Sequence, residues 1–143
     1  MANNSLSINI QADALRRYPT GQIACRKDGL LVWRWEVQPS CLSTKYTIKL
    51  VYRYGGTPKV WVLSPKPLAL AEGQTSLPHV YSTLEQQICL FYNAGEEEKE
   101  WRPDMILANT VVPWISEWLY FYELWLITGT WLGGGVHNGK VEK

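Results

Sequence analysis

The spacing of apolar residues changes along this chain, and that change constrains the fold more than any other sequence feature. Side chains alternate through residues 46–54, YTIKLVYRY: one side, the expected buried side, has Tyr46, Ile48, Leu50, Tyr52 and Tyr54, and the other has Thr47, Lys49, Val51 and Arg53. Strict alternation is typical of a strand with one covered and one wetter face. Between residues 106 and 126, apolar residues instead recur every three or four positions, which predicts a helix with one buried stripe. Strands are therefore expected to precede the main helix.

Three further patterns complete the predicted sheet. Residues 23–37 contain Asp28-Gly29, a hairpin-turn signal, between two strand-like runs. The turn at 55–58 (GGTP) is followed by another strand-like run at 59–63. These connections are too short for helical crossovers, so we expect a four-stranded antiparallel meander. Prolines keep residues 64–88 mostly irregular.

Helices are expected on both sides of this meander in the sequence. Residues 12–17 predict a short helix before the first strand. The later helix has Asp104 near its start, Gly129 at its end and Pro113 as a point of kinking. Sheet and helices in separate stretches predict an α+β fold with flanking helices. One shared core is expected to contain Trp33, Trp35, Leu50 and Trp118.

Length and composition exclude several classes of protein. A chain of 143 residues predicts a single domain over 1–143, and a net charge of +1 without a basic cluster does not favour nucleic-acid binding. The apolar stretch 105–132 is interrupted by Asn109, Pro113, Glu117 and Glu123, so we do not expect it to cross a membrane. Glu123 is expected to be solvated or to cap the helix, and Glu117 is open to bonding an indole N–H.

The three cysteines indicate a reduced compartment. Cys25, Cys41 and Cys89 are odd in number and form no CxxC pair, so neither disulfides nor a zinc site is expected. The first residues lack the apolar stretch of a signal peptide, and we expect a cytoplasmic protein. Cys25 and Cys41 are most simply packing residues.

Cys89 is the candidate nucleophile. It lies in QQICLFY, after the irregular segment and before the helix, where a loop can present a side chain from a rigid scaffold. A thiolate is a strong nucleophile, and its thioester remains reactive toward amines. A cysteine between Ile88 and Leu90 is also compatible with a small buried hydrophobe, and chemistry alone leaves both readings open.

The segment from Trp33 to Trp131 resembles the ubiquitin-conjugating enzyme superfamily. YRYGGTPKVWVLSP is similar to that family's third strand, its turn and the strand that follows. Leu77-Pro78-His79 stands where the family keeps the histidine of its His-Pro-Asn element, and Ile88-Cys89-Leu90 is similar to its catalytic triplet. Trp101-x-Pro103 resembles the Trp-x-Pro that opens the family's following helix. The resemblance implies a ubiquitin-conjugating-enzyme-like fold with Cys89 as nucleophile.

Residues 101–138 resemble a bacterial branch of that superfamily, the conjugating-enzyme-like proteins of short type II CBASS anti-phage operons. This resemblance implies that the cysteine forms a thioester with the C-terminus of a cGAS-like nucleotidyltransferase, a cyclic-nucleotide synthase, and regulates it. No metal or organic cofactor is implied.

The chain departs from the family at the active-site Asn, whose place is taken by Tyr81, while Val80 takes that of the Pro. Either the Tyr81 hydroxyl, Asn93 or a backbone amide substitutes for the missing donor, or transfer to an amine is weak in this chain. Thioester formation does not depend on this difference. His79 is expected to shape the loop through hydrogen bonds rather than act as a base, and Trp101 and Pro103 to position the segment after Cys89.

Two other functions remain as alternatives. The same fold could hold the synthase without chemistry, as a binding module, or act as a cysteine hydrolase on a small thioester or peptide.

Overall fold

The structure is a computed structural model that describes residues 4–91, 100–133, 135–137 and 140–142. Its helices are α1 (Ile8–Leu15) and α2 (Val111–Thr128), with a 3₁₀ turn η1 (Leu107–Asn109) before α2. Its first four strands are β1 (Gly21–Lys27), β2 (Leu30–Val37), β3 (Tyr46–Arg53) and β4 (Lys59–Ser64). The shorter strands are β5 (Val80–Ser82), β6 (Gln87–Ile88), β7 (Gly135–His137) and β8 (Lys140–Glu142).

The main sheet has the order β1-β2-β3-β4-β6-β5, and every pairing in it is antiparallel. The predicted meander is confirmed as β1 to β4. Asp28 and Gly29 form the β1–β2 turn with positive φ angles of 55° and 77°, as a tight hairpin requires. The irregular segment contributes β5 and β6, which extend the sheet beyond β4.

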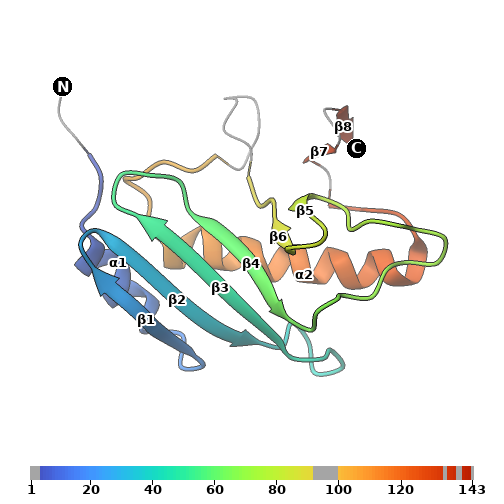
Figure 1. Cartoon of the computed structure of the whole chain (residues 1–143), viewed down its shortest axis with the longest axis horizontal. Coiled ribbons are helices and arrows are strands. Elements are labelled where there is room, and N and C mark those ends of the chain that lie inside the picture. Colours follow the sequence, from blue (N-terminus) through green and yellow to red (C-terminus); the bar gives the residue numbers. More distant parts are fainter. Residues whose placement is uncertain (1–3, 92–99, 134, 138–139, 143) are drawn as a thin grey trace.

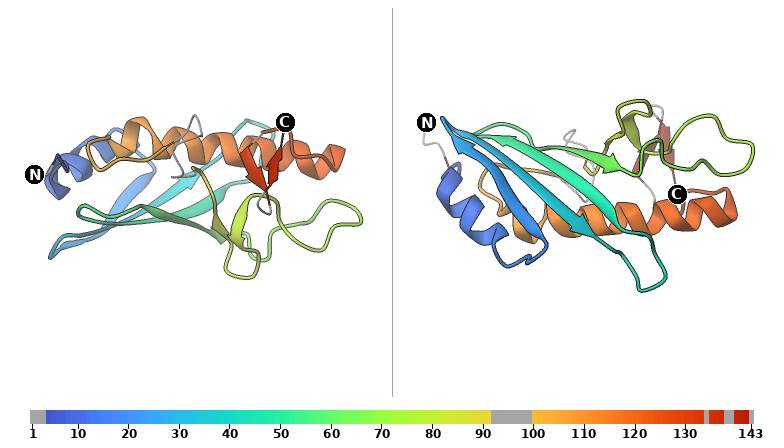
Figure 2. Two further views of the ribbon diagram at one scale, coloured as in Figure 1. Left: turned by 90° about the horizontal axis from the view of Figure 1, so that it is seen from above. Right: turned by 60° about the horizontal axis from the view of Figure 1, so that its bottom comes forward.

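Both helices cover one face of the sheet (Figures 1 and 2), so the α+β prediction is confirmed. The alternation in β3 explains which face is covered, because Tyr46, Ile48, Leu50 and Tyr52 are buried while the residues between them are partly exposed. Tyr54 was expected on the buried side, but it lies beyond the end of β3 and is exposed. The predicted core of Trp33, Trp35, Leu50 and Trp118 is confirmed as part of one buried cluster.

The helix boundaries differ from the prediction. α1 begins at Ile8, since the Ser7 hydroxyl accepts the Ile10 N–H and caps the helix. α2 begins at Val111 rather than near Asp104. Pro113 lies in its first turn, where a proline costs no hydrogen bond, so it produces no break. Gly129 ends α2 as predicted, with φ 76° and its N–H bonded to the Trp125 carbonyl at 2.8 Å.

Two interpretations of polar residues were wrong. Glu123 is not simply solvated: its carboxylate accepts hydrogen bonds from the Ser43 and Tyr46 hydroxyls, both at 2.7 Å, and so ties α2 to β3 and the preceding loop. Cys41 is exposed in that loop and is not a packing residue.

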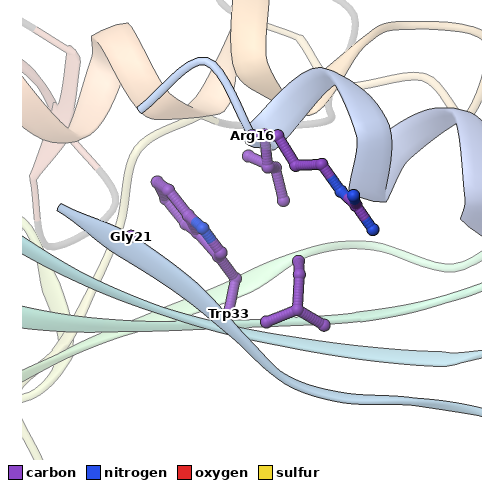
Figure 3. A pocket seen from close by; sticks show the side chains of 5 residues that line it. Arg16, Gly21 and Trp33 are labelled. Atoms are coloured by element: carbon purple, nitrogen blue, oxygen red, sulfur yellow. The ribbon is translucent and has the colours of Figure 1, made fainter. Parts of the chain in front are cut away.

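A hollow of about 280 Å³ opens between the end of α1 and β1 (Figure 3). It is lined by Leu15, Arg16, Gly21, Ile23 and Trp33. Gly21 is needed here because a Cβ atom on it would lie 2.5 Å from the Trp33 ring. This hollow belongs to the β1 end of the sheet order, whereas Cys89 follows β6 at the other end.

The described helices include none long and apolar enough to cross a membrane.

The core assignment predicts a large difference between two leucine substitutions. Leu50 is fully buried, whereas Leu42 is 95% exposed. Leu50→Ala should lower the free energy of unfolding by about 2–5 kcal/mol through lost burial and a cavity. Leu42→Ala, the matched control, should change it by less than about 0.5 kcal/mol. Urea denaturation of both variants measures this, and similar losses would contradict the assignment.

The Glu123 contact predicts a pH dependence at the alkaline end. Burial first, and then the hydrogen bond and charge of Glu123, raise the pKa of Tyr46 well above its ordinary value. Burial raises the pKa of Tyr122 to about 12. Because both phenols ionise more easily in the unfolded chain, their contribution is complete below about pH 10 and is lost as the pH rises further. The free energy of unfolding should fall from pH 10 to 12.

Removing one of these phenols should make that fall less steep. Tyr46→Phe should lower stability at pH 8, because the Glu123 hydrogen bond is lost, but flatten the decline above pH 10. Tyr120→Phe, at a position 54% exposed, is the control and should keep the wild-type slope. Urea melts at each pH measure both, and identical slopes for Tyr46→Phe and wild type would refute the coupling.

Candidate functional site

The short strand β6 places Cys89. Ile88 is buried and pairs with Val60 of β4 on one side and Val80 of β5 on the other. Since successive strand residues point to opposite faces, the side chain that follows the buried Ile88 points away from the core. Cys89 is accordingly half-buried and stands where β6 ends.

Cys89 has defined partners on its backbone and on its sulfur. Its N–H donates to the His79 carbonyl at 3.0 Å, so this amide is already used and does not point free toward an incoming acyl group. Its Sγ–H donates a weak hydrogen bond to the Phe91 carbonyl at 3.5 Å. The thiol therefore gives up the Phe91 contact when it ionises.

Tyr81 brings a second group to the sulfur. It occupies an irregularity in the β5–β6 register between Val80 and Ser82, and such bulges re-aim side chains. Tyr81 is 62% exposed as a residue. Desolvation of its hydroxyl, and then its interaction with the Cys89 side chain, raise the pKa of Tyr81. The phenol thus stays protonated and able to donate.

His79 is held in a demanding conformation. Its φ of 47° lies in the left-handed region that few residues other than glycine adopt. Its ring stacks on Trp131 with centroids 5.0 Å apart, and its carbonyl accepts from Cys89 and from the Trp118 indole. The Cys89 N–H and the His79 carbonyl therefore join these two residues through their backbones.

Trp101 and Pro103 lie on the next segment of the described chain and attach it elsewhere. The Trp101 indole donates to the Gly56 carbonyl at 3.2 Å in the β3–β4 turn and packs edge-on against Tyr52. The Pro103 carbonyl accepts the Leu6 N–H at 3.0 Å. Neither contact involves the sulfur. Asn93, the other expected donor, lies outside the described residues.

Sequence reasoning missed three residues that build this site. Gln86 is buried with φ 58°, and its side chain bonds the Leu68 N–H and the Val62 and Pro65 carbonyls, so it fastens the irregular segment to β4. Trp118 was expected only as core, and its indole N–H bonds the His79 carbonyl rather than Glu117. Trp131 was not singled out. The only sequence signal for the two tryptophans is that a buried indole needs an acceptor.

Within the part of the chain that the structure describes, no three His, Cys, Asp or Glu side chains gather in a way that would hold a metal ion. What the site offers is a thiol with a protonated phenol beside it. That pair can attack a carbonyl carbon and donate a hydrogen bond to the charge that develops.

The family of type II CBASS E2 proteins matches residues 11–138. The chain belongs to this family. The resemblance seen in the sequence is thereby confirmed, and a CBASS-associated role of conjugating-enzyme type follows from membership. A comparison with curated proteins found no match. The matched residues of this type II CBASS E2 protein include the whole main sheet, η1, α2 and Cys89.

The Tyr81 contact predicts a change in thiol reactivity. The thiolate is the nucleophile, and the Tyr81 hydroxyl beside it can donate a hydrogen bond to it during attack. Tyr81→Phe should slow iodoacetamide alkylation of Cys89 at pH 7 by about threefold, the effect of a hydrogen bond at the low end of the usual range. Peptide mass spectrometry separates Cys89 from the other cysteines. Tyr120→Phe should leave the rate unchanged, and equal or faster alkylation in Tyr81→Phe would argue against the contact.

Proposed function

We propose that this type II CBASS E2 protein forms a thioester between Cys89 and the C-terminal carboxyl group of a partner protein. The partner is a cGAS-like nucleotidyltransferase, and the adduct regulates its cyclic-nucleotide synthesis in anti-phage signalling. Family membership supports the reaction type. The observation that carries the proposal for this chain is the placement of Cys89 at the end of β6, where its side chain interacts with the Tyr81 hydroxyl.

The reaction needs a donor carboxyl group that arrives activated, as an acyl-phosphate type of anhydride. The Cys89 thiol first loses its proton to solvent. The thiolate then attacks the carbonyl carbon and a C–S bond forms, while the C–O bond to the phosphate breaks and the phosphate leaves with that electron pair. Negative charge develops on the carbonyl oxygen in the transition state, and a donor aimed at it lowers the barrier. The Tyr81 hydroxyl is the residue to which we assign this task.

The Cys89 amide is a poorer candidate for the same task because its hydrogen is engaged by His79. A protonated phenol has the further advantage that it does not compete as a nucleophile or base. Its raised pKa keeps it in that form through the physiological range.

Co-expression with the cGAS-like nucleotidyltransferase of the same CBASS operon tests the proposal. We expect a species with the mass of both chains less one water, present on non-reducing gels and lost with excess thiol. Cys89→Ser should trap the adduct as an ester that thiol does not cleave. Cys25→Ser and Cys41→Ser are the matched controls and should leave the thioester intact. Intact mass also separates a thioester from a disulfide, which loses two hydrogens instead of one water.

Two outcomes would replace the proposal. If no adduct forms and Cys89→Ala still supports defence, the protein is a binding module that holds the synthase. If the protein alone turns over a small thioester substrate and Cys89→Ala abolishes that turnover without any adduct, it is a cysteine hydrolase.

A further inference from the structure

One backbone carbonyl links the candidate nucleophile to the core helix. The His79 carbonyl accepts the Cys89 N–H at 3.0 Å and the Trp118 Nε1–H at 3.0 Å. A carbonyl oxygen has two lone pairs, so both bonds are made at once. The position of the Cys89 backbone therefore depends on an acceptor that Trp118 also holds.

The conformation of His79 needs support from its surroundings. A non-glycine residue at φ 47° persists only where neighbouring groups determine its geometry. Trp131 supplies one of these groups by stacking on the imidazole, and Trp118 packs against Trp131 with ring centroids 5.8 Å apart. Trp118 thus acts on His79 twice, through its N–H on the carbonyl and through Trp131 on the ring.

Trp118 is itself rigidly held. It is 3% exposed and stacks on Tyr122 of the same helix, with centroids 5.5 Å apart and ring planes within 6°. The Tyr122 hydroxyl donates to the Ala69 carbonyl at 2.6 Å, so the stack is anchored at its far end. The indole N–H is consequently aimed at a fixed point in space.

We infer that Trp118 is a positioning residue for Cys89: its indole N–H holds the His79 carbonyl, which in turn orients the Cys89 backbone and its sulfur. This inference rests on the proposed function of Cys89. Without the indole donor, the His79 carbonyl loses one of its two fixed partners and its left-handed conformation loses support. The hydrogen bond from the Cys89 N–H to the His79 carbonyl then breaks more often. The sulfur is no longer held in its place beside Tyr81 and Phe91.

Trp118→Phe tests the inference, since it keeps an aromatic ring in the core and removes the donor. Trp125→Phe is the matched control, with the same substitution at a residue of the same helix that is 4% exposed. Amide hydrogen exchange measured by NMR on the protein without partner is the first readout. Trp118→Phe should speed exchange of the Cys89 amide by about tenfold more than that of the Leu50 amide in β3. Trp125→Phe should change the two in parallel.

Adduct formation with the synthase is the second readout, and its rate should fall in Trp118→Phe but not in Trp125→Phe. The two readouts separate the hypotheses. Selective exchange at Cys89 with no adduct even in wild type would sink the proposed function and retain the coupling of Trp118 to Cys89.

Two results would overturn the inference. One is an equal increase in the amide exchange rates of Cys89 and Leu50 in Trp118→Phe. The other is a larger increase at Cys89 than at Leu50 in Trp125→Phe. If Trp118→Phe does not fold, the wild-type protein still decides the question. The Trp118 indole hydrogen should then resist exchange as long as core amides do, and exchange as fast as free indole would overturn the inference.

Discussion

The burial of α2 against the sheet is the contact on which the other parts of this structure depend. Tyr46, Ile48, Leu50 and Tyr52 supply the covered side of β3, and the helix supplies a buried stripe that includes Ile115, Trp118 and Leu119. Hydrophobic burial is non-directional, because apolar surface is stabilised by any contact that removes water from it. It holds the helix against the sheet, but it does not determine the path of an irregular segment.

Hydrogen bonds from buried polar side chains determine the path of the irregular segments. The segment between β4 and β6 has few backbone partners of its own, and it is fastened by Gln86 to β4 and by the Tyr122 hydroxyl at Ala69. α1 is docked in the same way, since Gln11 bonds the Met105 carbonyl and the Leu107 N–H. An unmade bond in such surroundings costs far more than a made bond gains. These few contacts therefore specify one arrangement among many that would bury similar area.

The candidate site inherits its geometry from both kinds of interaction. Ile88 is anchored as core between neighbouring strands, and this brings Cys89 to the surface side of β6. The His79 carbonyl then joins the strand end to α2 through Trp118. The candidate thiol is thus attached to a helix buried in the core, while Tyr81 remains exposed beside it. Support from the core on one side and exposure on the other suit the role proposed for Cys89.

The sequence by itself determined the order of α1, β1 to β4 and α2, the meander and the common core. Each of these follows from residues close in the chain, because periodicity and turn chemistry are local properties. Cys89 was singled out by its resemblance to the family's motifs, since its local chemistry also fits a small buried hydrophobe. Helix starts were less predictable: α2 begins at Val111, beyond Asp104, because the intervening residues form η1 and pack on α1. The pairing of β5 and β6 left no alternating pattern, since strands of two or three residues are too short for one.

Only the tertiary structure decided which polar atoms meet. Glu123 meets Tyr46, Gln86 meets Leu68, and Trp118 meets His79, each across many residues of chain. A hydrogen bond depends on distance and direction to within a few tenths of an ångström, and local patterns carry no information at that scale. Hydrophobic periodicity therefore predicts that Trp118 lies in the core, but only the tertiary structure shows that its indole N–H bonds the His79 carbonyl, which also binds Cys89.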